Sequence, residues 1–323
     1  MLYKRKQLES LSFVDNKPIL ERYLYKFHNQ RSEFKRLKLH EKDYVFGYMK
    51  IIKNDSGENV FDLYKISEAR EYVFYTIILN YGEDVAGFNG PLYGPYGKLS
   101  ALQIRKDKRF FYEYLATWIN QLKKGEGKYL MILKPLLNHK LNEIRKITKT
   151  AKEFDKRKIY CYAVFFCIYY KARLYFEERN EKFLRFDIQG YTFVANIYTF
   201  CHIYARHYVP SLNRGLPNSM NSKIPCIDLD DFLGSIKRII IAYFKFDLNL
   251  NESKEYLLFK VRREQYILWI KFKRMSELSQ NKGFEVRSFY KCQEARDLDK
   301  FINTVDIEFD KGCYCCYNDD EKQ

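Results

Sequence analysis

The stretch YLLFKVRREQYILWIKFKR, from Tyr256 to Arg274, decides the fold of the C-terminal half of the chain. It holds two runs of alternating apolar and polar residues, Tyr256 to Arg263 and Tyr266 to Arg274. Two residues separate them, and such a short spacing is typical of paired antiparallel strands. A third run, Gly283 to Cys292 (GFEVRSFYKC), follows a short polar gap. The three runs together predict an antiparallel meander.

The two faces of this predicted sheet differ in chemistry, because side chains alternate across a strand. One face collects the apolar residues, and in the third run the alternation gives this face Phe284, Val286, Ser288 and Tyr290. The other face collects six cations and two aromatic rings: Lys260, Arg262, Lys271, Lys273, Arg287, Lys291, Trp269 and Phe289. Clustered cations repel one another unless a polyanion lies against them, and aromatic rings can stack on bases. We therefore predict a nucleic-acid-binding sheet; the alternative is an ordinary solvated outer face.

The segments ahead of the meander are predicted to be helices. Ile159 to Tyr170 (IYCYAVFFCIYY) is an apolar run of 12 residues, which is too short to span a bilayer and fits a buried helix that continues to Arg179. Phe193 to Tyr208 predicts a second helix, which Pro210 ends. Asp228 to Phe246 predicts a third, with acidic residues at its positive end. The predicted fold of this half is α+β, with helices followed by a small antiparallel sheet.

The N-terminal half gives a mixed α/β or helical pattern. Glu71 to Asn80 fits either a strand or a buried helix, and the other segments have clearer patterns. These are a helical Lys4 to His40, a hairpin of Met49 to Lys53 and Val60 to Ile66, a Gly-rich loop from Gly82 to Gly97, an aromatic helix from Phe110 to Leu122, and a basic amphipathic helix from Lys134 to Lys158. The basic helix fits a nucleic-acid contact or a solvated face equally well.

Changes in charge along the chain suggest three regions. We expect an N-terminal domain of unknown role over residues 1–155, a second domain over 156–296, and an acidic, cysteine-containing tail over 297–323. Residues 254–296 hold eleven basic residues against five acidic ones, whereas residues 297–323 hold eight acidic residues against three lysines. The attraction for polyanions is therefore expected to be concentrated on the sheet.

The overall composition limits the class of protein. The formal net charge is +16, and such an excess attracts nucleic acid, an acidic protein or an anionic membrane surface. The N-terminal residues MLYKRKQ lack the apolar core of a signal peptide, and the eight cysteines show no disulfide pattern. Cys313, Cys315 and Cys316 lack the spacing of a zinc site. We expect a soluble, cytoplasmic protein without a cofactor or a membrane partner.

A group of residues suited to acid–base chemistry lies in HIYARHY. His202 and Arg206 are four residues apart and would share a helical face, and His207 lies next to them. Histidine titrates near neutrality and can move a proton on and off a ribose oxygen, while arginine can hold a phosphate. The alternative is structural, because cations are favoured at helix C-termini.

The order of these segments, a helix ending in HIYARHY, a second helix, and then YLLFKVRRE, YILWIKFKR and FEVRSFYKC, resembles the barnase, EndoU, colicin and RelE-like ribonuclease superfold, especially its phage-associated branch. The resemblance covers roughly residues 160–296. It implies metal-independent cleavage of RNA by attack of the 2′-hydroxyl, in a toxin or antiviral defence setting. The implied catalytic residues are His202, Arg206, His207, Lys271, Arg287, Ser288 and Tyr290.

Two other classes of function compete with this endoribonuclease hypothesis. Metal-dependent nucleases need clustered carboxylates, and Asp228, Asp230 and Asp231 are explained as a helix start. A non-catalytic protein that binds nucleic acid or another partner through a basic sheet would have the same positive charge but would not cleave RNA. RNA is the first candidate partner, DNA the second, and a protein inhibitor or partner is a further expectation.

Overall fold

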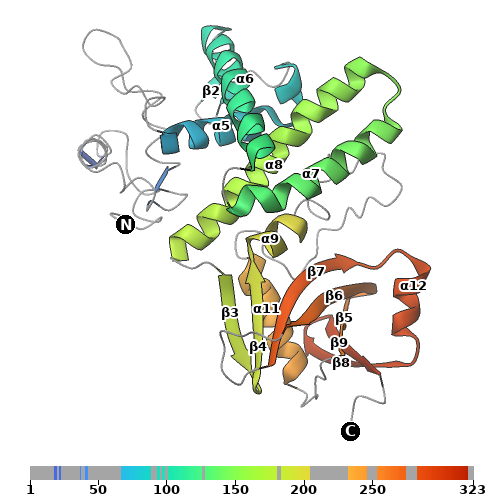
Figure 1. Ribbon diagram of the computed structural model, residues 1–323. Helices are drawn as coiled ribbons and strands as arrows, with labels where there is room; N and C mark the ends of the chain where they lie inside the picture. The colour runs from blue at the N-terminus through green and yellow to red at the C-terminus, as the bar shows by residue number, and fades with distance from the viewer. Residues whose placement is uncertain are drawn as a thin grey trace. The chain divides into compact units, whose positions relative to one another are not determined.

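The computed structural model describes residues 67–88, 93–94, 97–98, 101–125, 128–179, 183–203, 232–245, 253–273 and 282–318, together with 18–19, 22, 37 and 41–42. Its class is α+β, as predicted: a helical N-terminal region precedes a mostly antiparallel sheet (Figure 1). The predicted hairpin at residues 49–66, most of the predicted helix at residues 4–40, and both Arg206 and His207 lie outside the described residues.

The chain divides into two compact units. The first contains residues 1–134 and 148–181, and the second contains residues 135–147 and 182–323. The predicted boundary near residue 155 falls inside α8 (Ala151–Arg179), which continues through it as one helix. Charge patterning did not mark the boundary, because the charged residues from Lys152 to Lys158 form the first turns of that helix.

The helical unit is built around aromatic side chains. Its described helices are α5 (Ser67–Tyr81), the short η2 (Gly82–Ala86), α6 (Ala101–Lys124), the start of α7 (Lys128–Ile147), and α8; β1 (Tyr93–Gly94) and β2 (Gly97–Lys98) form a small ribbon. Phe74 of α5 packs against Phe111 and Tyr114 of α6 and Phe166 of α8, with ring centroids 4.7–5.2 Å apart. The apolar run at 159–170 is therefore buried in a helix, as predicted, and Glu71 to Asn80 is also helical.

The basic segment from Lys134 to Lys158 was predicted as one helix, and this prediction is wrong. The segment contains the end of α7 and the start of α8, with residues 148–150 between them. The hydroxyl of Thr150 accepts a hydrogen bond from the Glu153 N–H at 3.1 Å and so caps the new helix. Within the described helices, none is long and apolar enough to cross a membrane.

Seven strands of the described residues form one sheet in the order β3-β4-β7-β6-β5-β9-β8. The predicted meander is confirmed as β5 (Tyr256–Val261), β6 (Glu264–Lys273) and β7 (Lys282–Lys291), paired antiparallel. Four further strands extend it: β3 (Phe183–Ile188), β4 (Tyr191–Asn196), β8 (Thr304–Asp310) and β9 (Cys313–Asn318). Strand β4 runs parallel to β7.

Three of these strands, β4, β8 and β9, occupy positions where the sequence predicted other structure. Phe193 to Asn196 belongs to β4 rather than to a helix, and the helix that follows is the short α9 (Ile197–Ile203). The hairpin turn at Gln189 and Gly190 has positive φ at both residues, which is the geometry of a tight two-residue turn. Strands β8 and β9 likewise lie within the region that was predicted to be an acidic tail.

One face of the sheet packs against α11 (Phe232–Phe244), a helix whose predicted start at 228–231 lies outside the described residues. Tyr243 contacts Phe259 of β5 and Tyr317 of β9, and Phe244 contacts Phe193 of β4. Phe259 of β5 and Leu268 of β6 lie on this face, as the alternation predicted, whereas Leu258 and Ile267 lie on the opposite face.

A β-bulge changes the alternation in β7. Trp269 pairs with Ser288, but Ile270 pairs with Val286, so Arg287 is the extra residue. Phe289 therefore joins Val286 on the face covered by α11, where it is fully buried. Ser288 and Tyr290 lie on the opposite face, so the predicted faces of residues 288–291 are wrong.

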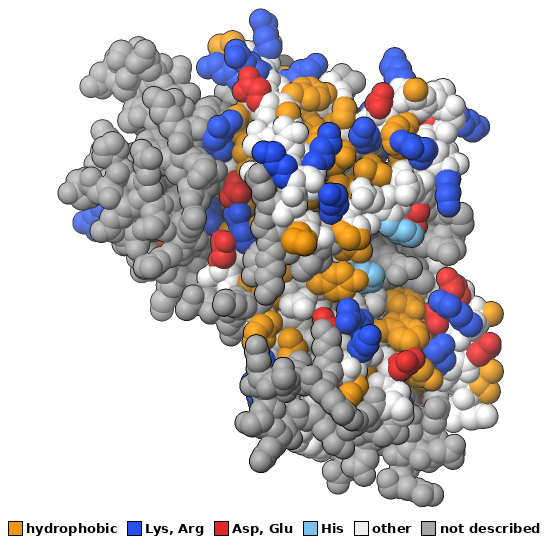
Figure 2. Space-filling view, viewed as in Figure 1, with side chains coloured by type: hydrophobic (Ala, Val, Ile, Leu, Met, Phe, Trp, Pro, Cys, Tyr) orange, Lys and Arg blue, Asp and Glu red, His pale blue; other side chains and the backbone are white. Residues whose placement is uncertain are grey.

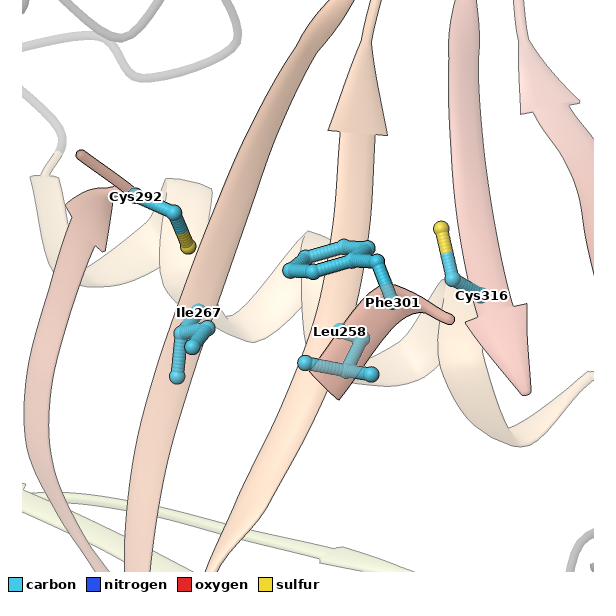
Figure 3. Close-up of a cluster of buried hydrophobic side chains, with 5 residues drawn as sticks. All are labelled: Leu258, Ile267, Cys292, Phe301 and Cys316. Carbon is cyan, nitrogen blue, oxygen red and sulfur yellow. The ribbon is translucent and has the colours of Figure 1, made fainter. Parts of the chain in front are cut away.

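The face opposite α11 is partly covered as well. The segment α12 (Ala295–Leu298) and η4 (Asp299–Phe301) lies over β5 and β6, and Figure 3 shows Phe301 between Cys292 and Cys316. The buried cluster contains Leu258, Ile267, Cys292, Phe301 and Cys316, with Tyr256 and Trp269 packed against it. This part of the sheet is a second small core rather than a solvated cationic surface.

Candidate functional site

The short helix α9 is held against β7 by hydrogen bonds that its first residues specify. The Asn196 side chain accepts the Thr199 N–H at 3.1 Å, and the Thr199 hydroxyl accepts the Asn196 N–H at 3.3 Å. These reciprocal bonds cap the helix. The same hydroxyl donates to the Val286 carbonyl of β7 at 2.8 Å, and Thr199 is fully buried. Residue 202 is thereby fixed relative to the bulge.

Five side chains meet where α9 lies on β7. The Tyr198 ring stacks on the His202 ring at 5.5 Å between centroids, and the Arg287 guanidinium carbon lies 6.0 Å from the centroid of the same Tyr198 ring. Arg287 also forms an ion pair with Glu285 at 2.8 Å, and Glu285 accepts a hydrogen bond from the Asn196 amide at 3.3 Å. We call Asn196, Tyr198, His202, Glu285 and Arg287 the α9–β7 cluster.

The cluster contains a buried residue, Glu285, and a partly exposed one, Arg287. The Glu285 side chain is only 6% exposed, whereas the Arg287 side chain is 36% exposed. A buried carboxylate is costly unless a cation and hydrogen bonds compensate it, and Arg287 and Asn196 provide both. Glu285 therefore orients the Arg287 guanidinium from the buried side, and the exposed part of Arg287 remains accessible to solvent.

Lys271 lies next to this cluster. It is exposed, and it stands directly opposite Glu285 in the β6–β7 ladder, so both side chains are on the same face of the sheet. Of the predicted catalytic residues within the described ranges, the structure thus brings His202, Lys271 and Arg287 into one region. Arg206 and His207 lie outside those ranges.

Tyr290 and Ser288 occupy a different environment. The Tyr290 hydroxyl accepts a hydrogen bond from Trp269 Nε1 at 2.8 Å and donates one to Asp297 Oδ2 at 2.9 Å. Burial raises the pKa of the Tyr290 phenol, and the hydrogen bond to Asp297 acts in the same direction. Ser288 is buried beside Trp269 in the ladder. These residues support the second small core, which gives them an ordinary structural role.

The residues predicted to bind nucleic acid are not arranged as one cationic face. Lys260 forms an ion pair with Asp306 of β8 at 2.7 Å, and Lys291 forms one with Glu264, which lowers the pKa of that carboxyl. Arg262 occupies the β5–β6 turn with φ of 57°. Phe289 is in the core, Trp269 is covered by Tyr256 and Lys300, and the side chain of Lys273 lies outside the described residues. The acidic strand β8, which was predicted to be a tail, supplies one of the compensating charges.

The cysteines of the described residues are all free thiols. Cys313, Cys315 and Cys316 lie in β9 and are buried, rather than in a tail. Burial raises the pKa of the Cys315 and Cys292 thiols to about 12. Within the described ranges, no group of three or more His, Cys, Asp or Glu side chains is placed to hold a metal ion.

Sequence reasoning missed Glu285, Asn196 and Tyr198. Glu285 looked like one more polar residue on an alternating strand, and Asn196 and Tyr198 fell inside the segment predicted to be a helix. The pattern Asn-x-x-Thr at 196–199 is a capping signal that could have marked the true start of α9. Comparison of the chain with protein-family models, curated proteins and solved structures found no match.

Proposed function

We propose that the α9–β7 cluster is the active site of a metal-independent endoribonuclease. The observation that supports this most strongly is the contact of one ring, Tyr198, with both His202 and Arg287, while a buried carboxylate holds Arg287 in place. A residue that can transfer protons and one that can bind a phosphate thus contact the same Tyr198 ring, although 85 residues separate them in the sequence.

The proposed reaction begins with attack of the ribose 2′-oxygen on the adjacent phosphorus. His202 accepts the 2′-hydroxyl proton, and Arg287 and Lys271 stabilise the charge that develops on the phosphate oxygens. The bond between phosphorus and the 5′-oxygen then breaks, which leaves a 2′,3′-cyclic phosphate and a free 5′-hydroxyl. The 5′-oxygen takes up a proton as it leaves, and we propose His207, the second histidine of HIYARHY, as its donor.

The test is cleavage of total RNA in the presence of EDTA by the wild-type chain and by two variants, His202→Gln and Arg287→Gln. Loss of a general base or of a phosphate-binding cation typically slows such reactions by about a hundredfold or more. Arg185→Gln is the control, because Arg185 is an exposed cation of the same sheet, on the edge strand β3. We expect both cluster variants to lose cleavage and the control to retain it.

Two outcomes would overturn the proposal. If both cluster variants cut RNA as fast as the control, the chemistry takes place elsewhere. If the wild-type chain binds RNA with a steep dependence on salt but gives no product, the protein is a binding module rather than an enzyme.

A further inference from the structure

The first half of α6 presents an exposed cationic surface that the proposed reaction does not use. The sequence RKDKR at 105–109 contains four cations and one carboxylate. The carboxylate, Asp107, is turned inward, is 1% exposed, and accepts a hydrogen bond from Gln103 at 2.7 Å. The exposed side chains of this segment are therefore Arg105, Lys106, Lys108 and Arg109, all of them positive.

Helical geometry brings most of these charges onto one stripe. At 100° per residue, Arg105, Lys108, Arg109 and Tyr112 fall within an arc of about 100° and along about 10 Å of the helix axis. The opposite side of α6 packs into the aromatic core through Phe111 and Tyr114. Figure 2 shows blue Lys and Arg side chains gathered around the upper end of α6.

Tyr112 is held in a defined position at the end of this stripe. Its hydroxyl donates a hydrogen bond to the Ala86 carbonyl at 3.2 Å, and its ring contacts Phe88 at 6.2 Å between centroids. The residue is nevertheless 37% exposed. A partly exposed ring that is already ordered can stack on a base at a small entropic cost.

Helix stability alone does not account for these cations. Lysines at a helix C-terminus, such as Lys123 and Lys124 of the same helix, are stabilised by the helix dipole. Arg105 and Lys108 lie nearer the N-terminus, where the dipole gives cations no advantage. Arg109, in the same exposed segment, forms an intrahelical ion pair with Glu113 at 2.9 Å, and both side chains of that pair are exposed.

We infer that Arg105, Lys108, Arg109 and Tyr112 form a surface that binds the backbone of single-stranded RNA. The arginines can hold phosphate oxygens with paired hydrogen bonds, and the ordered aromatic ring favours a nucleic acid over an acidic protein. The surface acts on affinity and not on bond cleavage, so it does not depend on the chemistry of the α9–β7 cluster.

The experiment measures binding of a 2′-O-methyl RNA oligonucleotide, which lacks the nucleophile and cannot be cut, over a series of salt concentrations. The test variant is Arg105→Gln with Lys108→Gln. The control variant, Lys123→Gln with Lys124→Gln, removes the same charge from the same helix. Each phosphate contact contributes about 0.7 to the slope of log affinity against log salt for a single strand, so we expect the test variant to lose about 1.4 and the control to lose almost nothing.

Tyr112→Leu adds a second readout, with an expected loss of about tenfold in affinity for the single strand. An equal loss of slope in the two charge variants, or no loss in either, would overturn the inference. Equally tight binding of poly-glutamate that is weakened by the same two substitutions would also overturn it, in favour of an acidic protein partner. None of these outcomes depends on whether the wild-type chain cleaves RNA.

Discussion

Glu285 carries its negative charge in a position that water scarcely reaches, and the Arg287 guanidinium lies 2.8 Å from it. The exposed part of Arg287 is available to a ligand, whereas the buried Glu285 is not. In the proposed active site, Glu285 is thus a positioning residue that holds one guanidinium in one orientation.

Glu285→Gln tests this role, because glutamine keeps the size of the side chain and can still accept the Asn196 hydrogen bond. We expect the turnover of saturating RNA to fall about tenfold, equivalent to about 1.4 kcal/mol in the barrier, because Arg287 loses its anchor. The measurement separates kcat from KM and adds a thermal melt. A lower melting temperature with unchanged kcat would show that Glu285 serves only the fold.

Because the Cys315 thiol is buried, we expect the free energy of unfolding to depend on pH. The pKa of this group is raised from 9.0 to about 12 by burial, so the folded state keeps the thiol neutral where the unfolded chain ionises it. Its contribution to stability is fully present below about pH 9 and is lost as the pH rises towards 12. Urea unfolding at about pH 8 and about pH 11 should show a loss in the wild type that is smaller in Cys315→Ala, by on the order of 2 kcal/mol. An identical loss in both proteins would contradict the prediction.

Helix α9 is short, and its place on the sheet depends on Thr199. Thr199→Val removes the hydroxyl that caps the helix and bonds to the Val286 carbonyl, while it keeps the volume of the side chain. We expect a loss of about 1 to 3 kcal/mol in the free energy of unfolding, together with slower RNA cleavage, because His202 is no longer fixed. Thr199→Ser retains the hydroxyl and should restore both quantities most of the way. If serine fails to restore activity, the hydrogen bonds are not what positions the helix.

The segment 295–301 is fastened to the sheet through Tyr290. Tyr290→Phe leaves Trp269 Nε1 without its acceptor and Asp297 without one donor. We expect a loss of about 1 to 3 kcal/mol in stability, measured by chemical denaturation, and an unchanged rate of RNA cleavage by the folded variant. If Tyr290→Phe has full stability but cleaves RNA slowly, Tyr290 takes part in catalysis and the prediction is wrong.

At the level of elements, regular alternation of apolar and polar residues predicted strands correctly. The sequence did not show where that alternation breaks. The strands β5, β6 and β7 follow from the period of two in their sequences, and the buried helix at 159–170 follows from its length and composition. The bulge at Arg287 does not, because Phe-x-Val-x-Ser-x-Tyr gives a plausible apolar side in the unbroken register too. The site depends on this bulge and on a helix start that lies four residues beyond the predicted one. Local pattern therefore predicted the three-strand meander but not the four strands that extend it, and it predicted only part of the site.

For the molecule as a whole, the net charge of +16 is distributed unevenly. An acidic residue of the C-terminal strand β8, Asp306, pairs with Lys260 of β5 and so reduces the positive charge of the sheet. The first half of α6 has the opposite arrangement, since its carboxylate is buried and its cations are exposed. We accordingly propose that the helical unit provides affinity for RNA and that the sheet unit provides cleavage. This division explains how a sheet with paired charges can still belong to a strongly basic protein.

The chemical nature of the product ends shows whether the chain cleaves RNA by attack of the 2′-hydroxyl. A synthetic RNA is incubated with the wild-type chain in EDTA, and the fragments are analysed by mass spectrometry beside the same RNA with a single 2′-deoxy nucleotide at the cleavage position. We expect a 2′,3′-cyclic phosphate on one fragment, a 5′-hydroxyl on the other, and no cleavage at the 2′-deoxy position. A 5′-phosphate end, or cleavage that continues at the 2′-deoxy position, would contradict this expectation.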